Sequence, residues 1–182
     1  EDFILTLSHD EVVHGKASMI GKMPGNRQSQ FANLRVAYGF MMAHPGKKLL
    51  FMGQDFAQYD EWSEERGIEW ELLQYEEHQN MQKYYQALNT LYKSQPALYE
   101  MDYDPEGFEW INSIAANENL LIFARKTKKK EETLLVICNF APVTREKYPV
   151  GVPFAGKYKE TFNSDQIDFG GTGVRNPRVK QS

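Results

Sequence analysis

The chain has 182 residues, a formal net charge of -4 at pH 7 and a hydrophobic fraction of 41%. That fraction is sufficient for a packed core, which excludes intrinsic disorder as the default interpretation. The acidic balance argues against nucleic-acid binding, which favours a basic face. No apolar run reaches the roughly 20 residues needed to span a membrane, so no membrane partner is expected. The one cysteine, Cys138, excludes disulfides within the chain, is expected in the core, and is typical of a reducing cytoplasm.

The first half of the chain alternates strand and helix patterns. FILTL at 3–7 predicts a short buried strand, and KKLLFMG at 47–53 predicts a second. Between them, a loop rich in Gly, Pro and Lys leads into an amphipathic helix that Pro45 and Gly46 end. A second amphipathic helix begins near residue 78 and ends before Pro96. The apolar positions expected to face the core are Phe31, Leu34, Tyr38, Met41, Met42, Met81, Tyr84 or Tyr85, Leu88, Leu91 and Tyr92.

This strand, helix, strand, helix order predicts parallel strands joined by right-handed crossovers. Long polar loops follow both strands, and α/β folds build their sites at the carboxyl ends of strands. Two such units cannot close a barrel or cover both faces of a sheet. The first half is therefore predicted to belong to a larger α/β sheet.

From about Gly107 the pattern changes to short strands separated by turn residues. We expect strands at 108–114, 120–126, 132–140, 145–153 and 157–164. No helical periodicity follows, so this part is predicted to be an antiparallel β-sandwich with Trp110 in its core. The basic run 126–132 is interpreted as a solvated hairpin tip. The boundary is expected within 99–107, which divides the chain into an α/β domain, 1–104, and an all-β domain, 105–182.

The most polar stretch, SHDEVVHGK at 8–16, directly follows the first predicted strand. A metal site is disfavoured there, because His9 and His14 are five residues apart, whereas zinc-binding helices place histidines at i and i+4. A structural role is possible, with Asp10 capping a helix and a histidine satisfied in the core. A carboxylate and an imidazole at a strand end are also suited to holding sugar hydroxyls. Position alone leaves these interpretations open.

Three longer segments together resemble a known family. They are LTLSHDEVVHGK at 5–16, MPGNRQSQFANLRVAYGFMMAHPGKKLLFMGQDFAQYDEW at 23–62, and LNTLYKSQPALYEMDYDPEGFEWI at 88–111. They resemble the C-terminal part of bacterial glycogen branching enzymes, the 1,4-α-glucan branching enzymes of the α-amylase superfamily. SHDEVVHGK followed by PGKKLLFMG at this spacing is highly specific to that family, whereas the His-Asp pair alone is shared across the superfamily.

The resemblance implies a (β/α)8 barrel, the TIM barrel, whose strands seven and eight with their helices lie in residues 1–104. A C-terminal antiparallel β-sandwich would follow in 105–182. Family sequences usually run past the position of residue 182, so a truncated sandwich is expected. The resemblance also implies that Asp10 stabilises the transition state and that His9 contacts the same sugar ring. The further glucan contacts that we assign are Glu11, Gln54, Asp55, Tyr59 and Trp62, with ordinary packing as the alternative for Tyr59 and Trp62.

The implied parent activity cleaves an α-1,4-glucan and transfers the segment to a 6-hydroxyl, which forms α-1,6 branches in cytoplasmic glycogen biosynthesis. No metal or cofactor is implied. The nucleophile and the general acid of the superfamily lie on strands four and five, outside this chain, so the chain alone is expected to be inactive and to self-associate through its exposed barrel edge. The sequence departs from the family at 53–58, where GQDFAQ stands in place of GNEFAQ. A non-catalytic glucan-binding β-sandwich is the alternative from another class, and DEVVHGK argues against an amylase or trehalohydrolase.

Overall fold

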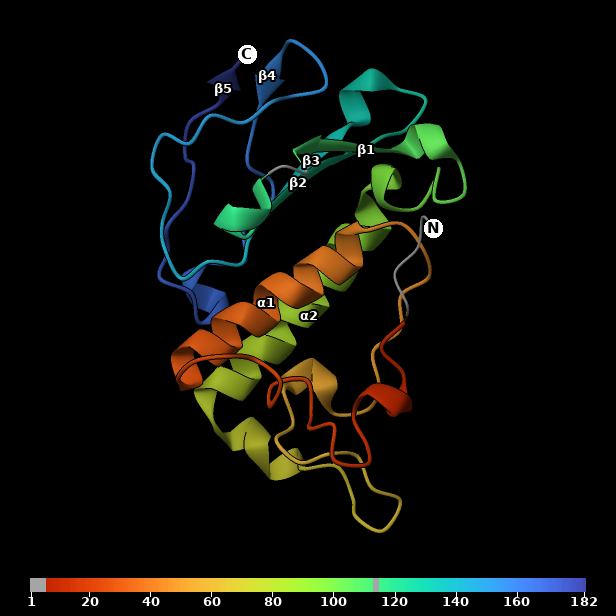
Figure 1. The fold of residues 1–182 in the computed structure, drawn as a ribbon, viewed down its shortest axis with the longest axis vertical. Coiled ribbons are helices and arrows are strands. Elements are labelled where there is room, and N and C mark those ends of the chain that lie inside the picture. The colour runs from red at the N-terminus through yellow and green to blue at the C-terminus, as the bar shows by residue number, and fades with distance from the viewer. Residues whose placement is uncertain (1–5, 113–114) are drawn as a thin grey trace.

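The structure is a computed structural model that describes residues 6–112 and 115–182. Two long helices, α1 (Arg27–Ala43) and α2 (Glu76–Ser94), lie side by side along the middle of the molecule (Figure 1). Asn26 caps α1 by accepting a hydrogen bond from the Ser29 backbone N–H, and the helix ends before Pro45 as predicted. Most of the predicted apolar positions are buried: Phe31, Leu34, Tyr38, Met41 and Met42 in α1, and Met81, Tyr84 and Leu88 in α2. Leu91 and Tyr92 are only partly buried.

The two predicted parallel strands are represented by a single bridge. Leu7 pairs with Leu50 in the parallel direction, as predicted, but residues 47–53 form no regular strand, so that prediction is wrong. Most of the other predicted strand, 3–7, lies outside the described residues. A parallel strand is stable when neighbours cover its edges and both its faces, and within residues 6–112 and 115–182 the segment 47–53 pairs with Leu7 alone. Barrel units are therefore not seen in the part of the chain that the structure describes.

An antiparallel sheet covers one end of the helix pair (Figure 1). Its strands are β1 (Phe108–Asn112), β2 (Leu120–Arg125) and β3 (Leu134–Asn139), with β2 in the centre. These strands confirm three of the five predicted ones. The last two residues of the strand predicted over 108–114 lie outside the described residues. The exposed hairpin tip between β2 and β3 is also confirmed.

The remaining β-structure is sparse. In the described part of the chain after β3, β4 (Lys157–Tyr158) and β5 (Lys180–Gln181) form a two-stranded sheet, so the strand predicted over 157–164 is reduced to its first two residues. The strand predicted over 145–153 is wrong, because that segment is irregular and contains Pro149 and Pro153, which have no backbone N–H to donate to a ladder. The antiparallel sheets fit the all-β part of the predicted fold.

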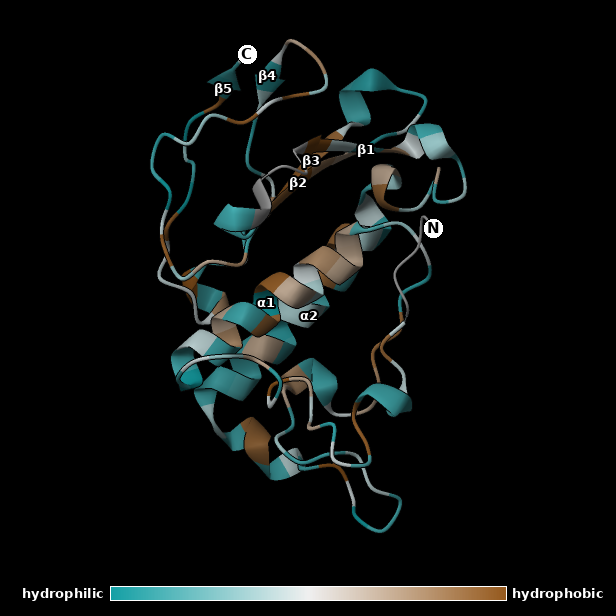
Figure 2. Ribbon diagram, in the orientation of Figure 1, coloured by the Kyte–Doolittle hydropathy of each residue, from teal (hydrophilic) through white to brown (hydrophobic). Residues whose placement is uncertain are grey.

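Two hydrophobic clusters hold these layers together. The first surrounds the helices and includes Tyr84, whose ring contacts Phe162 and Phe169 from the C-terminal segment, with centroids 5.8 and 5.3 Å away. The second joins the ends of the helices to the sheet through Ala43, Leu98, Phe123 and Cys138. The sheet strands carry mostly hydrophobic residues, whereas the turn at 130–132 is hydrophilic (Figure 2). Through Phe162 and Phe169 the C-terminal segment therefore packs against the helices.

Two predictions about single core residues had different outcomes. Cys138 is buried, as predicted, and burial raises the pKa of its thiol to about 12. Trp110, predicted in the sandwich core, is 43% exposed. It lies on β1, an edge strand, and packs edge-on against Phe108 and Phe123, with ring centroids 5.1 and 5.6 Å apart. An edge strand leaves part of such a large side chain uncovered.

Candidate functional site

Two short 3-10 turns follow the parallel bridge. His9–Glu11 comes just after Leu7, and Gln54–Phe56 comes just after Leu50. Because the bridge is parallel, both segments leave it in the same direction, so the two turns lie at the same end. The predicted residues at 9–11 and 54–55 are therefore brought to one side of the bridge.

The first turn presents an exposed imidazole–carboxylate pair. The Nε2 atom of His9 lies 3.1 Å from an Oδ1 atom of Asp10, and 52% and 68% of the two side chains are exposed. The imidazole ring packs against Phe51 and Trp62, at centroid distances of 5.9 and 6.2 Å. Phe51 and Trp62 in turn meet edge to face at 5.4 Å. An aromatic pair from the second segment therefore supports the His9–Asp10 pair, and Glu11 lies partly exposed beside it.

The loop after this turn is held by Glu61, to which the sequence analysis assigned no role. One carboxylate oxygen accepts a hydrogen bond from the Gly15 N–H at 2.9 Å, and the other accepts one from the Ala17 N–H. These bonds hold the pKa of Glu61 below its ordinary value. His14, Gly15 and Ala17 have positive φ angles of 57°, 79° and 64°, which side chains with a Cβ rarely adopt. Glu61 thus fixes an unusual backbone path beside the pair.

Gln54 and Asp55 have partners within the fold. Gln54 is fully buried, and its Oε1 accepts a hydrogen bond from the Met19 N–H at 3.0 Å. Asp55 is partly buried, and its Oδ2 accepts one from Gln82 Nε2 of α2 at 3.2 Å. Both residues lie at the predicted end of the bridge, but the Gln54 side chain is not exposed to solvent.

Tyr59 is packed rather than open. Its ring contacts the imidazole of His78 at 5.1 Å between centroids, and the Arg27 guanidinium lies 5.1 Å from the ring centre. The Tyr59 hydroxyl is buried, and burial raises its pKa. This geometry favours the packing alternative for Tyr59, whereas Trp62 lies beside His9.

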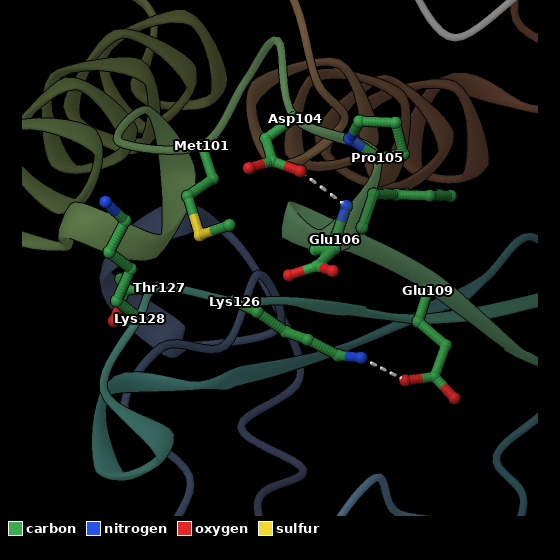
Figure 3. Close-up of a pocket in the computed structure, with 9 residues that line it drawn as sticks. Met101, Asp104, Pro105, Glu106, Glu109, Lys126, Thr127 and Lys128 are labelled. Atoms are coloured by element: carbon green, nitrogen blue, oxygen red, sulfur yellow. Dashed lines mark hydrogen bonds and ion pairs between the residues drawn. The ribbon is translucent and has the colours of Figure 1, made fainter.

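Two hollows formed by the described residues bear on the search for a site. The smaller, about 310 Å³, is next to the predicted site and is lined by Gln58, Asp60, Glu61, Trp62, Ser63, Arg66, Gly67, Ile68, Glu69 and Glu71. The larger, about 480 Å³, lies between the segment after α2 and the sheet (Figure 3). There Lys126 forms an ion pair with Glu109, and Asp104 accepts a hydrogen bond from the Glu106 N–H at 2.9 Å. None of the predicted site residues lines the larger hollow, so only the smaller one bears on the candidate site.

Within residues 6–112 and 115–182, no three side chains of the His, Cys, Asp and Glu types gather closely enough to hold a metal ion. None of the helices in this same part of the chain is both long and apolar enough to cross a membrane.

Comparisons with known proteins identify both parts of the chain. Residues 110–182 match the family described as alpha amylase, C-terminal all-beta domain. Over 176 residues the chain is 50% identical to the 1,4-alpha-glucan branching enzyme GlgB of Oceanobacillus iheyensis. This similarity covers 97% of this chain and 28% of that protein. The GlgB of Aquifex aeolicus is 49% identical over 182 residues, or 100% of this chain and 29% of that protein. The GlgB of Rhodopseudomonas palustris is 52% identical over 176 residues, which make up 97% of this chain and 25% of that protein.

The chain thus spans less than a third of the length of these relatives, although the similarity extends along nearly all of it. This similarity confirms the resemblance inferred from SHDEVVHGK and PGKKLLFMG, which lie outside the segment that matches the all-beta domain. By its sequence, the chain belongs to the 1,4-alpha-glucan branching enzyme family.

Proposed function

We propose that this chain forms the C-terminal part of a 1,4-α-glucan branching enzyme that acts in glycogen biosynthesis. Residues 1–104 supply strands seven and eight of its (β/α)8 barrel, and residues 105–182 supply the all-β domain. The relatives named as branching enzymes support this, since their similarity covers both parts. The single, buried cysteine is consistent with a reducing cytoplasm.

The observation that carries the proposal is the parallel bridge between Leu7 and Leu50. In (β/α)8 enzymes the active site lies at the carboxyl ends of the parallel strands. The bridge sends the turns His9–Glu11 and Gln54–Phe56 to one end, which is where such a site would be built.

In the proposed mechanism, Asp10 accepts hydrogen bonds from hydroxyls of the sugar as the ring flattens toward an oxocarbenium ion. His9 donates a hydrogen bond to a neighbouring hydroxyl. Such bonds strengthen as positive charge develops on the ring, so they raise the rate and not only the affinity. The exposure of both side chains supports these roles, because a glucan can reach them without a rearrangement of the core.

The glucan itself contacts Glu11, Asp55 and Trp62 in this proposal. The Trp62 indole offers an apolar face to a glucose ring and lies beside His9. Gln54 and Tyr59, whose polar side-chain atoms are buried, support the turn and the loop behind these contacts.

The bond-breaking groups come from outside this chain. A retaining mechanism needs a carboxylate nucleophile and a carboxylic acid about 5–5.5 Å apart on either side of the scissile bond. Asp10 and Glu11 are consecutive residues of one turn, so they cannot face each other across a sugar. The 182-residue chain alone is therefore inactive, and the complete enzyme transfers the cleaved segment to a 6-hydroxyl.

Replacing Asp10 by Asn tests the proposal in a branching enzyme that contains this sequence. The change removes one charge at nearly constant volume, and we expect branching, measured as new α-1,6 linkages in amylose, to fall by about 10²–10³-fold. Asp168→Asn, at another exposed aspartate, is the matched control and should leave the rate unchanged. Branching at the original rate in a folded Asp10→Asn enzyme would exclude the proposed role of Asp10.

A further inference from the structure

The turn that carries Asp55 has an unusual backbone on both sides. Gly53, before the turn, has φ and ψ of 79° and -11°, and Ala57, after it, has 61° and 49°. Glycine adopts this left-handed region readily, whereas a residue with a Cβ pays for it in steric energy. Ala57 is fully buried. Such a conformation persists only where the surrounding structure holds it in place.

Two buried side chains hold this turn from behind, one from each long helix. The Tyr38 hydroxyl of α1 donates a hydrogen bond to the Gln54 carbonyl at 2.8 Å. The Nδ1 atom of His78, in the first turn of α2, lies 2.7 Å from the Phe56 carbonyl oxygen, the last carbonyl before Ala57. Both side chains are fully buried. His78 therefore fixes the peptide at which the chain enters the left-handed conformation.

The contact to the carbonyl sets the protonation state of His78. A carbonyl oxygen only accepts hydrogen bonds, so Nδ1 must carry the proton. The other ring nitrogen, Nε2, is buried and has no hydrogen-bond partner among the described residues. The rings of Phe31, Tyr59 and Tyr75 surround the imidazole at centroid distances of 5.2, 5.1 and 6.4 Å. The neutral ring fits this aromatic enclosure, and a charged ring does not.

Three charged groups act on the imidazole from the elements around it. Glu77 of α2 and Glu69 of the preceding loop favour the protonated form, and Arg27 of α1 opposes it. Glu77 is already paired with Arg27, and Glu69 accepts hydrogen bonds from the backbone N–H groups of 59 and 60. Desolvation by burial outweighs the hydrogen bond to the Phe56 carbonyl and the two acids, which all favour the protonated form, so the pKa of His78 lies below its ordinary value.

We propose that His78 is a positioning residue for the turn that carries Asp55, and that a second proton on its Nε2 atom releases this turn in acid. A charged imidazole has no acceptor for the new N–H inside the enclosure, so the ring must move toward water. This movement breaks the bond from Nδ1 to the Phe56 carbonyl, and Ala57 and Asp55 lose their support. The part that concerns Asp55 rests on the proposed function.

The first experiment measures the imidazole directly in this chain, without glucan. Nitrogen-15 spectra of the histidine ring should show the proton on Nδ1 at pH 7. A proton on Nε2 instead would overturn the inference. This measurement needs no enzymatic activity, so it tests the hydrogen bond from His78 to the Phe56 carbonyl even if Asp10→Asn leaves branching unchanged.

The second experiment compares two substitutions of His78 in a branching enzyme that contains this sequence. The amide N–H of Asn can replace the Nδ1–H donor and does not titrate, whereas Leu removes the donor. We expect His78→Asn to retain the kcat of the original enzyme at pH 7 and to extend activity toward acid by about one pH unit. We expect His78→Leu to lower kcat at pH 7 by about tenfold or more.

The matched control is His44→Asn, since His44 also has a pKa lowered by burial but lies at the other end of α1. It should leave the acid limb of the activity profile unchanged. An acid limb that His78→Asn does not move, or full activity of His78→Leu at pH 7, would overturn the proposed role.

Discussion

Asp102 and Arg125 form a buried ion pair that joins the helical part of the chain to the sheet. The Arg125 side chain is completely buried, and 6% of the Asp102 side chain is exposed. The same guanidinium donates a hydrogen bond to the Ala43 carbonyl at the end of α1, at 2.6 Å. One side chain from β2 thus connects α1, the segment after α2 and the sheet.

Replacing Arg125 by Met should strongly destabilise the chain. The change leaves the buried Asp102 carboxylate without its ion-pair partner, which typically costs about 3–5 kcal/mol in free energy of unfolding. Urea unfolding followed by circular dichroism measures this loss. The double variant Asp102→Leu, Arg125→Met should regain much of it, because no unpaired charge remains. A single variant as stable as the original chain would show that the pair does not hold the two parts together.

Lys48 should destabilise the fold at neutral pH. Its ammonium group donates a hydrogen bond to the His44 carbonyl, and burial lowers its pKa from 10.5 to about 8. Between pH 8 and 10.5 the unfolded chain therefore binds more protons than the folded one, so this residue makes the free energy of unfolding rise with pH across that window. Lys48→Met should stabilise the chain at pH 7 by about 1–2 kcal/mol, after allowing for partial exposure.

Urea unfolding at pH 7 and pH 10 checks this prediction as a difference between variants, since other groups also titrate in this range. The advantage of Lys48→Met should shrink at the higher pH. Lys47→Met, at the exposed neighbouring position, is the matched control and should show no such change. An equal gain at both pH values would mean that packing, and not the charge, explains the effect.

Glu61→Gln should loosen the loop beside His9 and Asp10. The loss of charge weakens the hydrogen bonds from the N–H groups of Gly15 and Ala17, which hold a backbone with positive φ angles. We expect faster amide hydrogen exchange at these two positions with little change in global stability, since surface substitutions usually have small effects. Glu64→Gln, at an exposed position nearby, should leave both exchange rates as they are. Unchanged protection at Gly15 and Ala17 in Glu61→Gln would contradict the role of the carboxylate.

The helices could be predicted from the sequence because their signals are local. Apolar spacing, the Asn26 cap and Pro45 all act within a few residues. The strand at 47–53 could not be judged in this way, since a parallel strand depends on neighbours that are distant in sequence. Among the residues that the structure describes, Leu50 is the one member of that segment that pairs.

The candidate site was only partly predictable for a similar reason. The polarity of Gln54 suggested contact with a ligand, whereas the fold buries the residue and bonds it to Met19. His78 gave no signal at all, because it reads as an ordinary residue at the start of an amphipathic helix. Its role depends on the Phe56 carbonyl, which belongs to a different segment of the chain. The His9–Asp10 pair was recognised through family resemblance and not through any local pattern.

The isolated chain should self-associate through the segment around the parallel bridge. Leu49 and Met52, on either side of Leu50 and Phe51, are 43% and 47% exposed. Among the described residues this segment forms a single bridge and no ladder, and edges of this kind with exposed apolar side chains bind further chains. We expect light scattering to give a mass above that of one chain, which falls on dilution. Replacing both Leu49 and Met52 by Lys should return the chain to a monomer, because charged side chains on an edge oppose pairing. The control Val179→Lys, at an exposed apolar position near the C-terminus, should leave the measured mass unchanged. An original chain that stays monomeric at all concentrations would contradict the prediction.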